Sequence, residues 1–481
     1  MKKNNLITLL KIIKDNREIL EKQELELDLN ELLKLSEKEI EEILKIKNIK
    51  EKLWKLILIT DNSNISNERK EKFFSLLKIK DITTEEFFNI YNSLKEINPK
   101  IRKEEDYDKY ILKLKRILQQ SKEDFTLKYS VKALSNFEVF ISHECDMIID
   151  YILFSKEKHQ ALYGYLMTVY PNIMKNDKKI DILRIITSTT TKEQAENTLK
   201  TANNKDTQKH KFYLDILEKI SRAYGKYQSM YGYLASTELK ILNNKYFLYM
   251  LDLITTSKED FQAETMYRLL QTDMVYRKDC IELLEIIKGA KSKYHASSTY
   301  KLINDICFIN RKKALETLTI INTDAENKNQ VLYSCQMIKA LNELGINDSN
   351  LEKAVLLFVK ENDVDKLKCM YELVEIYPRI PQTVFIRILK MMSKCQSKEE
   401  AYKILKVATD DALLNEDDYY NKVKTSLKEQ KEDYVEIPLE EIMNINIDEL
   451  IEALNSCKEK EVYEVTNIKV KKHKLNINKI R

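Results

Sequence analysis

The sequence is poor in the two residues that most folds use for sharp turns. Its 481 residues include only 5 glycines and 5 prolines, whereas average usage is about 7% and 5%. Sheets joined by tight turns and loops that cradle phosphate groups both depend on glycine. Their scarcity argues against both, whereas an all-helical chain has no such need. The predicted fold class is therefore all-α.

Long hydrophobic runs and paired cysteines are also missing. No stretch approaches the roughly 18 uncharged apolar residues of a membrane span. The apolar run 6–10 is followed by Lys11, Lys14 and Asp15, which end it too early for a signal peptide. The seven cysteines contain no Cys-x-x-Cys pair, a pattern typical of core thiols in a reducing compartment. We expect a cytoplasmic protein without a membrane partner.

Recognisable catalytic patterns are absent too. The five histidines show no His-Glu-x-x-His or other paired-ligand spacing. No phosphate-binding loop or Gly-x-Ser-x-Gly elbow occurs. The triplet His143-Glu144-Cys145 comes nearest to a nucleophile beside a base, but neighbouring positions of a helix point in different directions. We therefore expect no enzymatic activity, no metal and no cofactor.

What the sequence does contain is a repeat. The segment Ser121–Phe125 recurs letter for letter as Ser257–Phe261, 136 residues later, which is four times 34. A polar residue, usually Gln, recurs in steps of 33 to 36 residues at Thr126, Gln160, Gln194, Gln228, Gln262, His295, Gln330, Lys366 and Glu400. A period in this range predicts an array of small units, each stacked on its neighbours.

Two helices are predicted in each unit, which we call helix A and helix B. An apolar pair at i and i+3 precedes the Gln and marks the buried stripe of helix A. These pairs are Ile149 and Ile152, Leu183 and Ile186, Leu217 and Ile220, Leu251 and Ile254, Leu284 and Ile287, Leu318 and Ile321, Val355 and Phe358, and Leu389 and Met392. Helix B starts near the Gln, where Thr191 with Gln194 has the spacing of a capping box.

Helix B carries a small residue followed four positions later by a large one. The small residue is Ala161, Ala195, Ala263, Ala296 or Ala401, and the large one is Tyr165, Tyr233, Tyr267, Tyr300 or Tyr371. This spacing places both on one helical face. The recurrent Gln and Tyr allow two interpretations: a ladder that contacts bases or peptide groups, or helix capping and core packing. The buried-looking alanine favours the structural interpretation.

A 34-residue unit of two antiparallel helices resembles the tetratricopeptide class and, more distantly, the pentatricopeptide class. The resemblance covers about Asp108 to Leu414 and rests on repeat length and helix pairing, because the Trp, Leu-Gly and closing Pro signature is absent. It implies a right-handed α-solenoid of about nine hairpins of 33–36 residues. It also implies two kinds of partner, since tetratricopeptide-like proteins usually bind proteins in a concave groove and pentatricopeptide proteins bind single-stranded RNA.

Residues 1–107 are predicted to form a helical N-terminal cap before the solenoid of residues 108–414. Ser36 with Glu39, and Thr83 with Glu86, have capping-box spacing. Trp54 is interpreted as a core anchor. A degenerate unit is considered around residues 87–91.

Residues 415–464 are interpreted as a helical C-terminal cap or linker, in which Pro438 starts a helix that continues to Leu454. Residues 465–481 are a basic tail with a charge of +6, and since the whole chain carries +4, the rest sums to −2. The tail's candidate binding residues are Lys469, Lys471, Lys472, Lys474, Lys479 and Arg481. Its alternating pattern suits a strand added to a partner's sheet, its cations suit nucleic acid, and a disordered solubilising terminus is the third interpretation.

These observations predict a non-enzymatic α-solenoid scaffold or adaptor that binds a protein partner through its concave face, with the tail as a second candidate site. One alternative is a helical-repeat protein that binds RNA or single-stranded nucleic acid, although a body of charge −2 offers few phosphate contacts. The other alternative is a regulatory subunit of a larger assembly or of a phage-defence system. No residue pattern selects that role.

Overall fold

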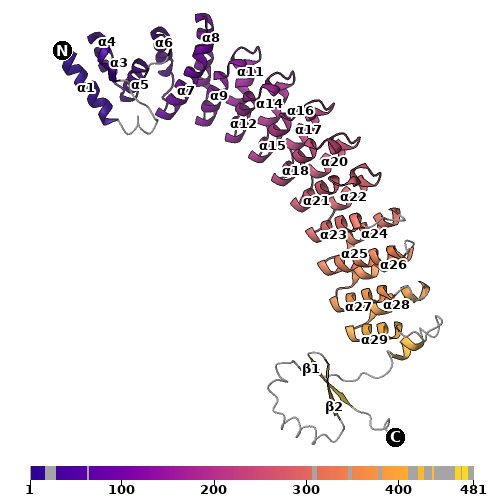
Figure 1. Ribbon diagram of the computed structural model, residues 1–481. Helices are drawn as coiled ribbons and strands as arrows, with labels where there is room; N and C mark the ends of the chain where they lie inside the picture. Colours follow the sequence, from indigo (N-terminus) through magenta and orange to yellow (C-terminus); the bar gives the residue numbers. More distant parts are fainter. Residues whose placement is uncertain are drawn as a thin grey trace, which may run out of the picture. The chain divides into compact units, whose positions relative to one another are not determined.

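The computed structural model describes residues 2–16, 29–61, 64–305, 311–344, 349–376, 382–409, 421–426, 436–437, 461–466 and 469–474. Up to residue 426 the described chain consists of helices and their connections, and three short strands follow (Figure 1). The prediction of a helical fold is confirmed for this part, and the small sheet is an addition to it. The chain divides into two compact units, Met1–Tyr300 and Lys301–Arg481.

In the first unit the helices of the repeat region form two rows (Figure 1). The A helices are α8 (Glu104–Gln120), α11 (Cys145–Leu153), α14 (Lys179–Thr187), α17 (Tyr213–Ser221), α20 (Phe247–Thr255) and α22 (Cys280–Lys288). The B helices are α9 (Asp124–Ser135), α12 (Lys158–Val169), α15 (Lys192–Ala202), α18 (Lys226–Thr237), α21 (Asp260–Leu270) and α23 (Lys293–Asp305). From α11 to α22 each A helix contacts the next, and from α9 to α21 each B helix contacts the next.

The predicted core positions are buried because the two rows pack on each other. Every residue of the eight apolar pairs is at most 3% exposed, and the alanines at the start of the B helices are fully buried. Gly232 marks the closest approach, since an added Cβ would lie 2.9 Å from the Thr255 side chain. The apolar periodicity thus located both helices of each unit.

A third element of the unit was not predicted. After each B helix of the first unit up to α21 comes a single turn, namely α10 (Phe137–Phe140), α13 (Pro171–Met174), α16 (Lys205–Gln208), α19 (Leu239–Leu242) and η2 (Asp273–Tyr276). Asn136, Asn204 and Thr272 cap three of these turns through their side chains, and Pro171 opens another. Four residues are too few for helical periodicity to appear in a sequence.

The N-terminal segment continues the same packing. Its helices are α1 (Lys2–Asp15), α3 (Leu29–Lys34), α4 (Glu37–Lys45), α5 (Ile49–Thr60), α6 (Asn67–Leu77), α7 (Thr84–Ile97) and η1 (Asn98–Lys100). Both predicted capping boxes are present. Trp54 is 3% exposed and stacks on Phe87 at 5.2 Å, so it is a core anchor as predicted. Helices α6 and α7 contact α8 and α9 in turn, which supports a degenerate unit here.

The second unit contains α24 (Arg311–Asp324), α25 (Lys328–Glu343), α26 (Ser349–Lys360), α27 (Val364–Glu375), α28 (Gln382–Lys394), α29 (Lys398–Ala408) and a helix at 421–426. It repeats the A-to-A contacts in α24–α26–α28 and the B-to-B contacts in α25–α27–α29. None of the helices in the described ranges is long and apolar enough to cross a membrane. The prolines at 378 and 381 and the helix predicted from Pro438 lie outside the described residues.

The three strands are β1 (Glu436–Ile437), β2 (Glu461–Thr466) and β3 (Lys469–Lys474). They form an antiparallel sheet in the order β1-β3-β2. The extended conformation predicted for the start of the tail is therefore confirmed. β3 pairs with β2 along its length and with β1 at Val470 and Lys471, and its addition to a partner's sheet stays a prediction.

The buried stripe of α20 provides a direct test of the packing. Replacing Leu251 and Ile254, both fully buried, by Ala should lower the free energy of unfolding by about 2–5 kcal/mol per site, because the lost methyl groups leave cavities. Urea unfolding followed by circular dichroism measures this loss. The matched control is Leu239→Ala, because Leu239 is 53% exposed. Equal stability of the two variants would contradict the assigned core.

Candidate interaction surfaces

The triplet His143-Glu144-Cys145 does not form a catalytic pair. His143 and Glu144 lie in the turn before α11, and the His143 side chain is 87% exposed. Cys145 is the first residue of α11 and is 2% exposed. Burial raises the pKa of its thiol to about 11, so the thiolate required of a nucleophile is scarce near neutral pH.

The other described cysteines are buried as well. Burial raises the pKa of Cys280 and Cys335 to about 12 and that of Cys395 to about 11. Within the described ranges, no group of three or more His, Cys, Asp or Glu side chains is arranged to hold a metal ion.

The recurrent Gln connects one unit to the next. Gln160 accepts hydrogen bonds through Oε1 from the backbone N–H of Lys156 at 2.9 Å and of Glu157 at 3.2 Å. Its Nε2 donates to the carbonyl of Thr189, past the end of the next A helix, at 2.8 Å. The same donor bond runs from Gln194 to Ala223 at 2.7 Å, from Gln262 to Ala290 at 3.0 Å and from Gln330 to Glu361 at 3.0 Å. The structural interpretation of the Gln ladder is confirmed.

The remaining copies vary this joint. Lys366 keeps the donor and bonds the carbonyl of Cys395 at 3.0 Å, while Glu400 keeps the acceptor and receives the N–H of Gln396 at 2.9 Å. Gln228 is 1% exposed, but its Oε1 accepts no hydrogen bond. Lys366 and Gln228 are 8% and 1% exposed, so their burial leaves these two side chains little surface for contact with a ligand.

Replacement of Gln194 tests the joint. The change Gln194→Ala leaves the N–H groups of Thr190 and Thr191 and the carbonyl of Ala223 without their partner. An unsatisfied buried group costs about 1–3 kcal/mol, and the free energy of unfolding should fall by at least that amount. The neighbouring Lys192 is exposed, and Lys192→Ala should change it by less than about 0.5 kcal/mol. Similar urea midpoints for both variants would argue against the joint.

Three of the recurrent Tyr residues contact a second Tyr of the preceding unit. Tyr129 stacks on Tyr165 at 6.0 Å between ring centroids, and the rings of Tyr231 and Tyr267 at 5.5 Å and of Tyr333 and Tyr371 at 6.1 Å meet at a tilt. Each pair joins the position three residues after one Gln to the position five residues after the next. Such pairs contribute about 0.5–1.5 kcal/mol beyond burial. The Tyr ladder therefore has the predicted structural role, although its stacking partner was not foreseen.

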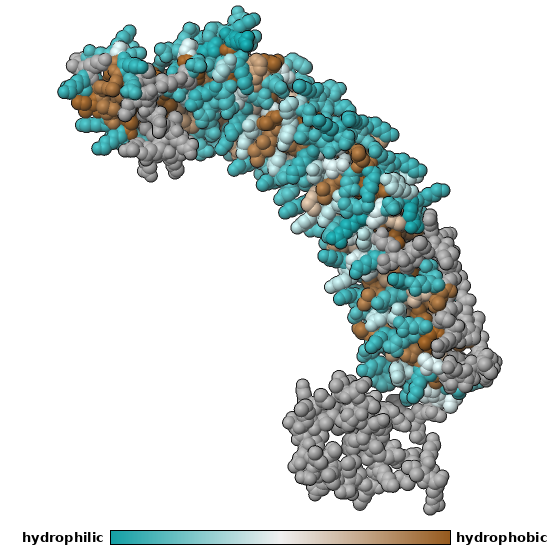
Figure 2. Space-filling model, in the orientation of Figure 1, coloured by the Kyte–Doolittle hydropathy of each residue, from teal (hydrophilic) through white to brown (hydrophobic). Residues whose placement is uncertain are grey.

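The outer sides of the B helices in the first unit nevertheless form an apolar surface, which we call the B-helix face. Its partly or fully exposed side chains are Leu162, Tyr165, Leu166, Val169, Tyr227, Met230, Tyr231, Tyr233, Leu234 and Phe261. Several charges among them are paired, as in Lys200 with Glu196 at 2.7 Å and Arg268 with Glu264 at 2.7 Å. Figure 2 shows that hydrophobic residues reach the surface of the repeat region in patches between hydrophilic ones.

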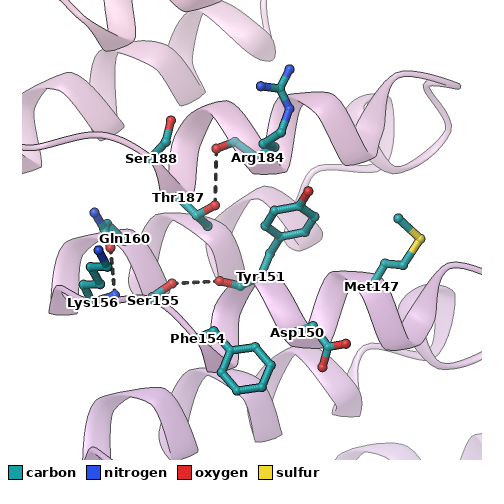
Figure 3. Close-up of a pocket in the computed structure, with 10 residues that line it drawn as sticks. All are labelled: Met147, Asp150, Tyr151, Phe154, Ser155, Lys156, Gln160, Arg184, Thr187 and Ser188. Atoms are coloured by element: carbon teal, nitrogen blue, oxygen red, sulfur yellow. Dashed lines mark hydrogen bonds between the residues drawn. The ribbon is translucent and has the colours of Figure 1, made fainter.

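The A helices carry a different surface. Ion pairs join neighbouring A helices, for example Lys113 with Asp146 at 2.6 Å and Arg184 with Glu218 at 3.6 Å. One groove of about 690 Å³ interrupts this surface between α11 and α14 (Figure 3). It is lined by Met147, Asp150, Tyr151, Phe154, Ser155, Lys156, Gln160, Arg184, Thr187 and Ser188. The groove was not predicted, because its members are separated in sequence and its exposed Met147 and Phe154 have no apolar counterpart in the next unit.

The candidate residues of the tail are only partly covered by the structure. Lys469, Lys471, Lys472 and Lys474 lie in β3, whereas Lys479 and Arg481 lie outside the described residues. The register of the sheet places Lys471 opposite Glu464 and Lys474 opposite Glu461. Two of the predicted binding positions therefore face acidic positions of β2 in the strand register.

Comparison with known proteins gives no family to which the chain can be assigned. No protein-family model matches the sequence, and a search of curated proteins finds no match.

Proposed function

We propose that the protein is a non-enzymatic scaffold or adaptor that binds a protein partner through the B-helix face. The observation that carries the proposal is this face itself, on which exposed aromatic and aliphatic residues of α12 and α18 lie among paired charges. Aromatic residues and Met are enriched in protein interfaces, whereas unpaired charges are depleted at their centres. Tyr227 and Val169, 42% and 50% exposed, are its most accessible apolar groups.

The architecture proposed with this function is a right-handed α-solenoid of about nine units in which the B-helix face is the concave one. Gln joints and Tyr–Tyr contacts between units support a rigid array. A rigid surface loses little conformational entropy on binding, which favours affinity. The five described cysteines are free and buried, in keeping with the proposed cytoplasmic location, where thiols stay reduced.

Binding of RNA or single-stranded nucleic acid is the less favoured alternative. Affinity for phosphates requires many Lys and Arg contacts, but Lys128, Lys200 and Arg268 on the B helices each have a carboxylate partner. The tyrosines that would stack on bases contact one another instead. A regulatory role within a larger assembly or a defence system is compatible with a scaffold, and no described feature selects it.

Exposed positions of the B-helix face provide the test. The double change Tyr227→Ser and Val169→Ser should reduce partner capture from native cells by about tenfold or more, because truncating a central interface residue costs about 2 kcal/mol or more. The measurement is an affinity pull-down with and without nuclease, quantified by mass spectrometry. Its matched control is Tyr246→Ser with Ile141→Ser, at residues 48% and 63% exposed beside the short helices.

The nuclease arm separates the two partner classes. Nuclease-resistant capture that falls in the B-face variant and persists in the control supports the proposal. Capture that nuclease abolishes would instead favour the nucleic-acid alternative, and capture unchanged in the B-face variant would exclude this face.

Deletion of Val465–Arg481 tests the tail. We expect unchanged helical circular dichroism and an unchanged melting temperature of the helical region, since β3 pairs with β1 and β2. Binding of the captured partner should weaken, because the deletion removes six cations. A variant with Lys469 and Lys472 replaced by Gln distinguishes charge from loss of the strand. If the truncated and full-length chains bind equally, the tail has no part in recognition.

A further inference from the structure

Helix α11 departs from the surface pattern of the next two A helices, α14 and α17. It presents Met147, Tyr151 and Phe154 at positions i, i+4 and i+7, with Met147 50% and Phe154 61% exposed. The positions corresponding to Met147 and Phe154 are polar in the next two units. They are Asp181 and Ser188 in the unit of α14, and Asp215 and Arg222 in the unit of α17.

The fold does not require these apolar side chains. Ser188 and Arg222 are exposed as Phe154 is, so the position contributes to no core in these units. A polar side chain at such an exposed site would be less costly than an apolar one. Large apolar patches on a protein surface usually serve an interaction. The stripe on α11 therefore calls for an explanation outside the packing of the repeat.

The stripe borders the groove between α11 and α14, whose polar atoms are largely engaged within the protein. The Ser155 hydroxyl donates to the carbonyl of Tyr151 at 2.9 Å, and the Thr187 hydroxyl donates to that of Leu183 at 2.9 Å. Gln160 uses its oxygen and one N–H in the joint between units. The rest of the groove surface is mostly apolar, and the groove is large enough to hold a large side chain. At one end lies Met147, whose flexible side chain can adapt to different ligands.

The charges at the groove favour an anionic ligand of modest charge. Figure 3 shows Arg184 and Asp150 on either side of Tyr151, with Lys156 near Gln160. Asp150 is already paired with Arg116. Arg184 is 46% exposed and holds Asp181 and Glu218 only at 3.5 and 3.6 Å. Among the described residues the Lys156 ammonium has no ion-pair partner. The charged residues that line the groove are thus the unpaired Lys156, Arg184 with its two long ion pairs, and Asp150, which Arg116 neutralises.

We propose that the groove between α11 and α14 is a second docking site, which binds a short acidic peptide segment carrying one aromatic or large aliphatic anchor. The anchor packs on Tyr151 and Phe154, and the carboxylates of the peptide meet Lys156 and Arg184. The stripe spans about 10 Å along α11, which corresponds to about two helical turns of a ligand. A phosphate backbone is disfavoured by the presence of Asp150 and by the small number of cations.

This site is independent of the B-helix face, because its residues belong mainly to the A helices. The test is a selection of random 12-residue peptides displayed on phage against the full chain. The enriched peptides should share an aromatic or large aliphatic residue flanked by Asp or Glu. Synthetic, fluorescein-labelled copies are then measured by fluorescence anisotropy.

The decisive variant is Met147→Asp with Phe154→Ser, which gives α11 the residues that the next unit carries at Asp181 and Ser188. It should fold like the wild type by circular dichroism and bind the peptides at least about tenfold more weakly. The matched control is Phe212→Ser, at a phenylalanine 38% exposed before α17, and its affinity should be unchanged. Reversal of charge in Lys156→Glu with Arg184→Glu should weaken acidic peptides and shift the selection to basic ones.

Three results would overturn the proposal. The first is a selection that enriches no peptide on the wild type relative to the Met147→Asp, Phe154→Ser variant. The second is a set of enriched peptides without an acidic bias. The third is binding that the charge reversal leaves unchanged. Loss of partner capture through the B-helix face would leave these outcomes unaffected, so failure of either proposal can be recognised separately.

Discussion

Four neighbouring pairs of units are held by one kind of hydrogen-bonded joint, in which a single amide side chain opens a B helix and bonds the following unit. An amide side chain carries its acceptor oxygen and its donor nitrogen on separate atoms, and in Gln194 the oxygen accepts from the start of its own helix while the nitrogen reaches the carbonyl of Ala223. Because an unsatisfied buried group costs about 1–3 kcal/mol, this side chain stabilises both the start of its own helix and the contact with the next unit. Two other repeat positions keep only one of these two functions. Lys366 retains the donor half and leaves capping to Asp363, whereas Glu400 retains the acceptor half alone.

Features shared by most units were the ones that could be predicted. The buried pairs of eight A helices and the alanine at the start of five B helices recur at near-constant spacing, and burial accounts for both. The one-turn helices escaped prediction because a turn of four residues has no period of its own. Their buried pairs at 173–174 and 241–242 are nevertheless separated by two repeat lengths of 34 residues. The stacking partner of Tyr165 was missed since it lies in the preceding unit. The groove beside α11 could not be foreseen, because it depends on three residues that only one unit carries.

The two rows of helices differ in how their surfaces are satisfied. Along the A helices, charges of one unit meet opposite charges of the next, as Lys113 meets Asp146. Such exposed pairs contribute little stability, typically below about 1 kcal/mol, but they leave a surface with few unpaired groups. Along the B helices many charges pair within their own helix, as Glu196 does with Lys200, and the space between the pairs is occupied by Tyr, Leu and Met. The B helices thus offer apolar area between their charge pairs, whereas the A helices combine ion pairs between units with local apolar groups such as Met147 and Phe154.

In a repeat protein each unit serves as a control for the others, and this separates structure from recognition. A residue that recurs, is buried and bonds its neighbour, such as Gln160, is explained by stacking. A residue that is exposed, apolar and confined to one unit, such as Phe154, is not. The proposed B-helix site would gain affinity from several partly exposed side chains on successive helices, so no single one need dominate. The proposed groove concentrates recognition in one anchor and two cations. A partner that engages both would combine a broad contact with a specific one, and linking two binding events in this way raises the overall affinity above that of either alone.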